Sequence, residues 1–263
     1  MIWNKLFERD VFGNSLFLKR VVIGFLAAAT FGRINIWNKL KVAGWENLDN
    51  LPEKNVLFIS NHQTYYADVI AIYHAFSAHK WGFRKIPFFP IYMFAPRINV
   101  YYVAAEETMY ESGWIPKIFA LTGAVTVRRS WRHKGQEVNR APDKQAPEKI
   151  KKALESGWVI HFPQGTTSPY AIVRKGTAHL IKEFKPVVVP IVINGFRRAF
   201  DKKGLRFKKT NTQLSITFKT PWIPTDGETL EAIQERIIKL IEQEKPFILQ
   251  QFHKDREDNA PIA

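Results

Sequence analysis

Cysteine is absent from this chain of 263 residues, which excludes disulfide bonds and thiolate metal sites and suits a reducing compartment. The sequence also contains no internal repeat, no glycine-rich phosphate-binding loop and no dinucleotide fingerprint. We therefore expect no resident cofactor and no metal ion. Metal-ligand spacing is likewise missing from five histidines, namely His74, His79, His133, His179 and His253.

Long hydrophobic runs are also missing. The uncharged run 21–32 has twelve residues, short of the roughly 20 that a bilayer-crossing helix needs. Basic residues and tryptophan flank this run, which favours a helix dipping into one leaflet; an ordinary core helix is the alternative. Residues 1–10 carry charges of both signs and no cleavage-site pattern, so no signal peptide is expected. We predict that residues 1–45 are helical and that 1–40 form a separate segment at the membrane interface.

Positive charge and aromatic residues are abundant. The formal net charge is +15, and aromatics make up 14% of the chain, with eight tryptophans. A basic chain favours a polyanionic partner, and the candidates are nucleic acid, an anionic membrane surface and an acidic carrier. The aromatic content favours the membrane, where amphipathic rings lie at headgroup level. We therefore expect monotopic attachment to the cytoplasmic face of an anionic leaflet, with no nucleic acid as a partner.

Apolar runs of strand length alternate with segments of helical periodicity. This alternation predicts an α/β fold, with a mostly parallel mixed sheet flanked by helices, over residues 41–252. The tail 253–263 is expected to be disordered. The predicted strands are 56–59, 99–104, 124–127, 158–162, 187–194 and 214–219. The predicted helices are 69–79, 108–121 with an interruption, 147–156, 178–184 and 229–244.

Residues 80–97 form an unusual stretch in which large apolar side chains alternate with three prolines and basic residues stand at both ends. The prolines argue against a long helix or a central strand. We expect an apolar loop. Three roles remain open for it: a second membrane contact, a lid over an acyl chain, or simple core packing.

The first predicted strand runs directly into a candidate catalytic pair. It ends at Ser60-Asn61, His62 follows, and a helix starts near Tyr66 with Asp68 in its first turn. A carboxylate that orients a histidine makes a general base, because it fixes the tautomer and stabilises the imidazolium. Taken alone, the stretch also fits a loop histidine beside an aspartate at a helix start.

Two further strand ends carry candidate substrate-binding groups. The strand 124–127 ends in two arginines, whose guanidinium groups suit bidentate contact with phosphate. The strand 158–162 runs into a Pro-Gln-Gly-Thr-Thr turn that offers close backbone approach and neutral hydrogen bonds. His161, just before this turn, fits a packed strand histidine better than a ligand-binding one. The candidate substrate-binding residues are Arg128, Arg129, Gln164, Gly165, Thr166, Thr167 and Lys175.

Four blocks of sequence, taken together, resemble the glycerolipid acyltransferase family of lysophosphatidic acid acyltransferases. The resemblance covers roughly residues 40–220, and the blocks follow one another in the family's order. They are Asn61-His62 with Asp68, Gly123 with Arg129, Phe162-Pro-Gln-Gly-Thr-Thr-Ser168, and Val189-Pro190-Ile191.

The resemblance implies an enzyme of phospholipid biosynthesis that transfers a fatty acyl group directly, without a covalent enzyme intermediate. The donor would be acyl-CoA or acyl carrier protein, and the acceptor would be the hydroxyl of a lysolipid. His62, held by Asp68, would take the proton of that hydroxyl. Arg129, Gly165 and Thr166 would inherit the family's contacts with the acceptor phosphate.

Three departures from the family pattern leave the acceptor open. Five residues instead of four separate His62 from Asp68, so a bulge or a shifted helix start is needed to bring them into contact. Gln164 replaces the family glutamate, so we expect one charge fewer at the acceptor site. Thr167 replaces an arginine, for which Arg128, Arg174 or Lys175 could substitute. The acceptor could therefore be a lyso-aminolipid or another hydroxylated lipid. An alternative function of a different class is that of a non-catalytic basic protein that binds lipid or nucleic acid.

Overall fold

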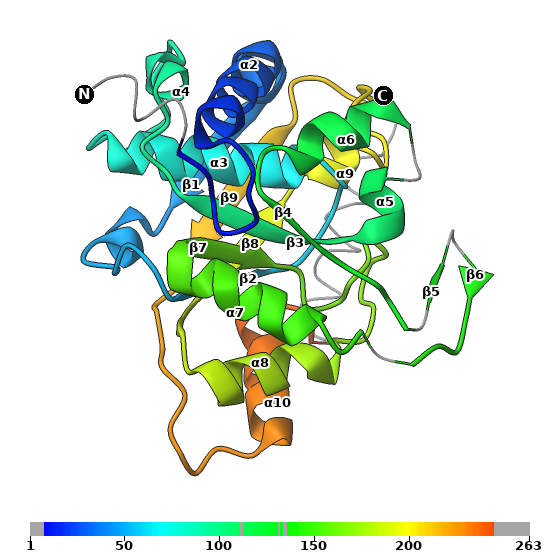
Figure 1. The fold of residues 1–263 in the computed structure, drawn as a ribbon. Helices are drawn as coiled ribbons and strands as arrows, with labels where there is room; N and C mark the ends of the chain where they lie inside the picture. The colour runs from blue at the N-terminus through cyan, green and yellow to red at the C-terminus, as the bar shows by residue number, and fades with distance from the viewer. Residues whose placement is uncertain (1–7, 111–112, 131, 134–135, 142, 245–263) are drawn as a thin grey trace.

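The computed structural model describes residues 8–110, 113–130, 132–133, 136–141 and 143–244. The expected tail 253–263 and the first seven residues of the predicted interfacial segment lie outside this part of the chain. Figure 1 shows a central sheet with helices on both faces, which is the α/β arrangement expected from the sequence.

The central sheet has seven strands in the order β1-β9-β8-β2-β7-β3-β4. Among the described residues, β8 and β9 are antiparallel and every other neighbouring pair is parallel. The prediction of a mostly parallel mixed sheet is therefore confirmed. The strands are β1 Lys39–Ala43, β2 Val56–Ser60, β3 Val100–Ala105, β4 Ala124–Val127, β7 Trp158–His161, β8 Val187–Asn194 and β9 Gln213–Phe218. A separate small hairpin, β5 Arg132–His133 with β6 Gln136–Glu137, lies between β4 and α7.

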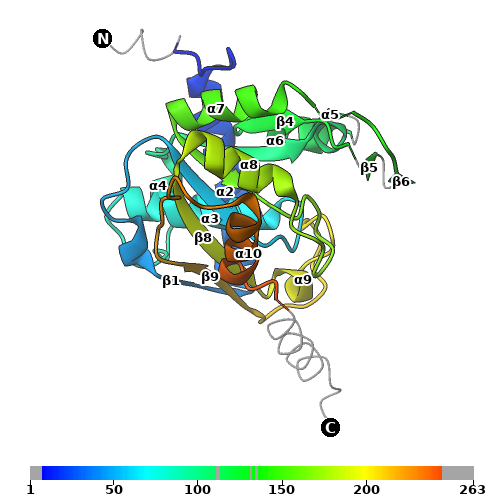
Figure 2. The same ribbon diagram turned by 90° about the horizontal axis from the view of Figure 1, so that it is seen from below.

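Ten helical segments accompany the strands within the described residues. They are α2 Leu16–Asn35, the 3₁₀ helix η1 Trp45–Leu48, α3 Ala67–Lys80, α4 Ile91–Phe94, α5 Glu106–Tyr110, α6 Trp114–Ala120, α7 Ala146–Ser156, α8 Lys175–Phe184, α9 Phe196–Ala199 and α10 Leu230–Leu240. Helices α2, α3 and α4 cover one face of the sheet, and α7, α8 and α10 cover the other (Figures 1 and 2).

The middle of the sheet is buried on both faces, as expected for parallel strands covered by helices. All five residues of β2 are buried, and alternate side chains enter different cores. Phe58 packs with Phe76 of α3 and Trp158 of β7 on one side. Leu57 belongs to the second core, which is formed with the helices of the opposite face. The turn that leaves β2 therefore starts from the most constrained part of the fold.

The N-terminal segment, predicted to be helical over 1–45, differs from this prediction on both sides of α2. Before the helix, residues 8–15 form a turn closed by an antiparallel bridge between Arg9 and Ser15. Residues 39–43 are not helical but form the edge strand β1, which pairs in parallel with β9. The Asn38 side chain closes the connection between helix and strand, since it donates to the Arg33 carbonyl (2.9 Å) and accepts from the Thr212 amide (3.0 Å). This pairing joins residues about 170 positions apart, and the alternation of charged and apolar residues in 39–43 was its only local sign.

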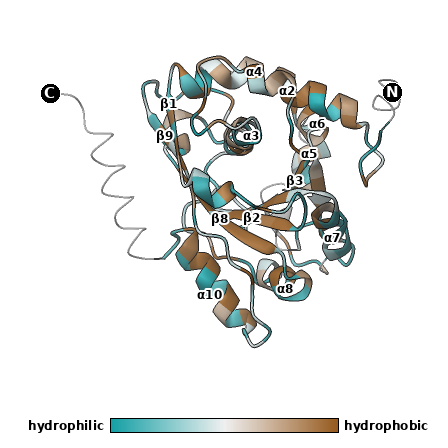
Figure 3. Cartoon of the chain, turned by 90° about the vertical axis from the view of Figure 1, so that its left-hand side faces the viewer, coloured by the Kyte–Doolittle hydropathy of each residue, from teal (hydrophilic) through white to brown (hydrophobic). Residues whose placement is uncertain are grey.

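Helix α2 and the 80–97 segment present apolar side chains outward. Figure 3 places α2 and α4 next to each other, with α3 between them and the sheet. On this side the exposed large apolar residues include Phe17, Val21, Phe25, Phe88, Phe89, Ile91 and Phe94. Tyr92 and Met93 of α4 point inward and are buried, so the 80–97 segment also contributes to the core. Among the described residues, no helix has the length and apolar character needed to span a membrane.

Candidate active site

His62 and Asp68 are in contact, as the sequence predicted. His62 lies in the turn between β2 and α3, and its Nδ1 is 2.9 Å from Oδ2 of Asp68. The aspartate side chain is fully buried, whereas 12% of the histidine side chain is exposed. An ionised carboxylate can only accept hydrogen bonds, so Nδ1 carries the proton and Nε2 remains as the basic nitrogen.

The extra residue between the two side chains is absorbed by a turn that closes around the carboxylate. Helix α3 begins at Ala67, so Asp68 stands in its first turn, where negative charge is favoured. Besides His62, its Oδ2 accepts hydrogen bonds from the backbone amides of Gln63 (2.6 Å) and Thr64 (2.9 Å). Its Oδ1 accepts from the Thr64 hydroxyl (2.7 Å). One carboxylate therefore holds the whole turn that carries the histidine.

The other side of the turn is attached to strand β8. The Asn61 side chain donates to the Ile193 carbonyl (2.9 Å) and accepts from the Ile193 amide (2.8 Å). It thus continues the ladder of backbone hydrogen bonds beyond the end of β2. The Gln63 side chain accepts from the amide of Arg197 (3.1 Å). The imidazole itself stacks on the ring of Phe162, with the centroids 3.9 Å apart and the planes at 19°. These contacts leave the histidine little freedom to turn away from Asp68.

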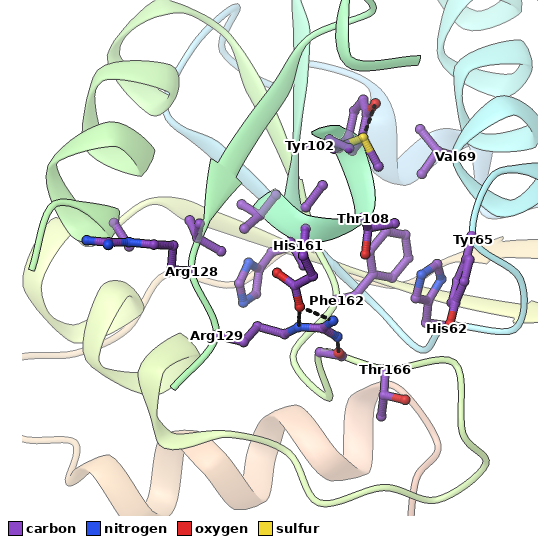
Figure 4. Close-up of a pocket in the computed structure, with 18 of the residues that line it drawn as sticks. His62, Tyr65, Val69, Tyr102, Thr108, Arg128, Arg129, His161, Phe162 and Thr166 are labelled. Carbon is purple, nitrogen blue, oxygen red and sulfur yellow. Dashed lines mark hydrogen bonds and ion pairs between the residues drawn. The ribbon is translucent and has the colours of Figure 1, made fainter. Parts of the chain in front are cut away.

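His62 lies at the edge of a cavity of about 1130 Å³. Small-molecule binding sites usually have volumes of about 300–1,000 Å³, so this cavity is large enough for a substrate at or above the upper end of that range. Figure 4 shows His62 and Tyr65 at one end and Arg128 at the other. One wall is apolar and is formed mainly by Tyr66, Val69, Tyr102, Met109, Trp114 and Ile115. The cavity therefore joins a basic nitrogen to a long apolar surface.

Arg129 lines the cavity and connects three elements. Its Nε and Nη2 donate to Oε1 of Glu107 in α5, the first at 2.8 Å, and its Nη1 donates to the Gly165 carbonyl (3.1 Å). Glu107 was not among the residues selected from the sequence. From the sequence, Glu106 and Glu107 have the character of two acidic residues in the first turn of a helix, which is a common position for such residues. The charge of Arg129 is thus balanced by a buried carboxylate.

Four of the seven candidate substrate-binding residues line the cavity: Arg128, Arg129, Gly165 and Thr166. Gly165 has a positive φ of 63°, which glycine adopts without strain. This backbone conformation turns its carbonyl toward Arg129 and places the next residue, Thr166, at the cavity. The arginine block after β4 and the turn after β7 therefore meet at the cavity, although β3 lies between the two strands in the sheet.

The other three candidates lie away from the cavity lining. Gln164 is buried, and its Nε2 donates to the Ala171 carbonyl (2.8 Å) and to Oε1 of Gln243 (2.9 Å). Thr167 is buried, and its carbonyl accepts from Arg197 (3.1 Å). Lys175 is exposed and lies 3.7 Å from Glu231. The expectation that Gln164 removes a charge from the acceptor site therefore does not fit its position, because its amide serves the packing of the loop.

Several cavity residues were not selected as binding groups from the sequence. Arg174, at the start of α8, was considered only as a substitute cation, and it does line the cavity. Lys202 and Lys203 also line it, from a loop after α9 that no sequence motif marked. His161 both packs and lines the cavity: its Nε2 is 2.8 Å from the Thr177 hydroxyl. Burial lowers the pKa of His161 to about 4, so its ring is neutral at physiological pH.

Two expectations concern what is not at the site. None of the residues 80–97 lines the cavity in the described part of the chain, so the structure gives no support to a lid role for that segment. Within the same residues, no group of three or more histidine, cysteine or acidic side chains is placed to hold a metal ion.

Comparison with known proteins adds two findings. A sequence model of the family described as Acyltransferase matches residues 39–194, which is more than half of the chain. The crystal structure of the 1-acyl-sn-glycerophosphate (LPA) acyltransferase PlsC from Thermotoga maritima has a similar fold, with a TM-score of 0.56 and 16% sequence identity. The match covers 95% of this chain and 86% of that one. No curated protein matches the chain in a sequence search.

Proposed function

The chain belongs to the acyltransferase family, and we propose that it transfers a fatty acyl group from a thioester to the hydroxyl of a lysolipid in phospholipid biosynthesis. One observation carries this proposal: the basic Nε2 of His62, oriented by Asp68, lies at the edge of a large cavity with an apolar wall. The donor is acyl-CoA or acyl carrier protein, which serves as a co-substrate and not as a bound cofactor.

In the proposed reaction the acceptor hydroxyl attacks the thioester carbonyl. Nε2 of His62 takes the hydroxyl proton as the new C–O bond forms, and the buried carboxylate of Asp68 stabilises the imidazolium. The C–S bond then breaks, and the proton passes from His62 to the leaving thiolate. Because a bound hydroxyl can attack directly, no enzyme nucleophile is required.

The cavity walls suit the two ends of a lipid substrate. The apolar wall can take up an acyl chain, and each buried CH₂ contributes about 0.8 kcal/mol. Arg128, Arg129, Gly165 and Thr166 face the same space from the polar side. We expect Arg129→Ala to raise the Michaelis constant for the acceptor more than that for the donor. Equal effects on both constants would argue against a contact between Arg129 and the acceptor.

The outward apolar face formed by α2 and residues 80–97 supports attachment to a membrane. Exposed apolar patches of this kind mark interaction surfaces, and a lipid acceptor has to be reached in its bilayer. The positive net charge of the chain favours an anionic leaflet. We propose that this face lies against the cytoplasmic leaflet. Replacing Phe25, Phe88 and Phe94 together by serine should release the protein from anionic vesicles, and unchanged partitioning would place the contact elsewhere.

A transfer assay tests the proposed function. Purified protein is incubated with labelled acyl-CoA or acyl carrier protein and a panel of lysolipids, and the products are identified by mass spectrometry. We expect a diacyl product with at least one acceptor, and its loss in His62→Ala with vesicle binding unchanged. Undiminished turnover in His62→Ala would refute the base assignment. Vesicle binding without any transfer by the unaltered protein would favour a non-catalytic lipid-binding role.

A further inference from the structure

The loop of residues 201–206, which follows α9, is tightly closed by its own backbone and by one side chain. Oδ1 of Asp201 accepts hydrogen bonds from the amides of Leu205 (2.8 Å) and Arg206 (3.0 Å). The Asp201 carbonyl accepts from the amide of Gly204 (2.8 Å), whose φ is +80°. The lysines at 202 and 203 contribute only backbone to this closure, so their side chains are available for another role.

This loop is attached to the turn that carries the catalytic histidine. The amide of Tyr65 donates to the Lys202 carbonyl (3.0 Å), and the amide of Tyr66 donates to the Lys203 carbonyl (3.1 Å). The contact is so close that a Cβ atom at Gly204 would lie 2.7 Å from the backbone nitrogen of Ala67, the first residue of α3. The backbone of the two lysines is therefore fixed relative to the turn that carries His62.

Both lysines belong to the cavity lining, and both are exposed. Within the described part of the chain, neither forms an ion pair with a carboxylate. Lys202 Nζ lies 5.8 Å from the centre of the Tyr65 ring, a weak contact at most. Arg129 differs, because its guanidinium is already paired with Glu107. In the part of the chain that the structure describes, the lysine pair thus supplies positive charge next to the turn that carries His62, and no carboxylate forms an ion pair with it.

We propose that Lys202 and Lys203 bind the phosphate group of the acceptor headgroup. This inference rests on the proposed function and names the class of its acceptor, a lysolipid with a phosphate monoester. Two ammonium groups suit a phosphate with a charge near −2, and hydrogen bonds between charged partners are among the strongest in proteins.

The position of the loop favours the acceptor over the donor as the source of the phosphate. The acceptor hydroxyl has to lie within hydrogen-bond distance of His62 Nε2 when it reacts. In a lysophospholipid only a short glycerol link separates this hydroxyl from the phosphate, so the phosphate stays near the histidine turn. The phosphates of acyl-CoA or of an acyl carrier protein are separated from the thioester by the long pantetheine arm.

The test compares the double variant Lys202→Ala/Lys203→Ala with the unaltered protein. Short-chain lysophosphatidic acid and the matching neutral monoacylglycerol serve as acceptors, and binding of each is also measured by calorimetry. We expect the dissociation and Michaelis constants for the phosphorylated acceptor to rise at least about tenfold. The constants for the neutral acceptor and for both donors should change less than about twofold.

Three controls keep the result interpretable. Lys151→Ala/Lys152→Ala removes the same charge from an exposed face of α7 away from the cavity, and it should behave as the unaltered protein. Lys202→Arg/Lys203→Arg should retain most of the affinity for the phosphorylated acceptor. Thermal unfolding of the double alanine variant should be nearly unchanged, because the loop is held by its backbone and by Asp201.

Three outcomes would overturn the proposal: an unchanged constant for the phosphorylated acceptor, an equal loss for both acceptors, or a rise confined to the donor. The last would assign the lysines to the donor's phosphates. If the unaltered protein transfers no acyl group to any lysolipid, the proposed function fails. Calorimetric binding of short-chain lysophosphatidic acid that is lost in the double alanine variant would still uphold the phosphate site.

Discussion

The carboxylate of Glu107 accepts two hydrogen bonds from the guanidinium of Arg129, and both side chains are largely buried, with 8% and 15% of their surface exposed. In such a place the loss of one partner leaves a charge without a counter-charge, which costs more than the loss of both. The two residues are therefore expected to act as a unit.

The first prediction concerns this ion pair. Glu107→Ala should lower the free energy of unfolding by about 3 kcal/mol, because Arg129 is left charged and largely buried without the Glu107 carboxylate. The double variant Glu107→Ala/Arg129→Ala should lower the free energy of unfolding by clearly less than the sum of the decreases in the two single variants. Urea unfolding of the four proteins measures the coupling. The pair Glu53 and Lys80, at 2.8 Å, is the control, because the Glu53 carboxylate is 85% exposed, and its expected coupling is below about 1 kcal/mol. Similar coupling in both pairs would contradict the prediction.

The second prediction concerns Asp68→Asn. The change removes the charge that stabilises the imidazolium, so kcat should fall by roughly 10²–10⁴-fold. Steady-state kinetics with saturating acceptor measures it. Thr64→Val is the control, because it deletes only the hydroxyl contact with Oδ1 and leaves the imidazole contact in place. Its effect should fall mainly on stability, at about 1 kcal/mol. Comparable losses of kcat in the two variants would mean that Asp68 acts only by closing the turn.

The third prediction concerns Gln164→Glu, which restores the residue of the family pattern. The buried Nε2 donates to the Ala171 carbonyl, and an ionised carboxylate cannot donate. We expect a loss of about 1–3 kcal/mol in unfolding free energy at pH 7 and no gain in turnover. Burial would raise the pKa of the introduced carboxyl group, and its protonated form can donate, so the loss should shrink as the pH falls toward 4. A loss that does not depend on pH would contradict this account.

The fourth prediction follows from Lys19, on the inner side of α2. Its Nζ lies 3.8 Å from the centre of the Tyr101 ring, and burial lowers the pKa of Lys19 from 10.5 to about 7. Between these two values the unfolded chain binds more protons than the folded one, so this lysine makes the protein more stable as the pH rises from 7 to 10.5.

Lys19→Met should remove this dependence. Near pH 7 and below, the variant should be more stable by roughly 3 kcal/mol, since one pKa unit corresponds to about 1.4 kcal/mol and the lost ring contact offsets part of the gain. The gain should vanish toward pH 10.5. Denaturant unfolding at several pH values measures it, with Lys41→Met on the exposed edge of β1 as the control. A gain that is the same at every pH would show that burial of charge is not the cause.

The elements that place the catalytic pair were predictable because their signals are local. The run 56–59 has the length and composition of a buried strand, and the helical spacing after Tyr66 predicted a helix over 69–79, which begins two residues earlier, at Ala67. The sequence also indicated that the extra residue before Asp68 would need a shifted helix start or a bulge. The turn that Asp68 closes with Gln63 and Thr64 meets that need.

What could not be predicted depends on contacts between distant parts of the chain. Strand β1 exists because β9 pairs with it, and nothing in residues 39–43 shows where β9 lies. Glu107 approaches Arg129 only after α5 and β4 pack. Gln164 was interpreted as a missing charge at the acceptor site, but its partner Gln243 follows it by 79 positions. Local patterns identify reactive groups, whereas the fold decides which of them remain available.

The sharing of Asp68 between the imidazole and the surrounding amides has a consequence for how activity can be lost. The same oxygen that selects the tautomer of His62 also accepts from the amides of Gln63 and Thr64, in the turn that leads into helix α3. If Oδ2 of Asp68 is displaced, the start of α3 therefore becomes disordered and His62 is no longer oriented as a base. Heating or denaturant should abolish turnover at the same point at which the first turn of α3 frays, with no well-folded but idle species in between.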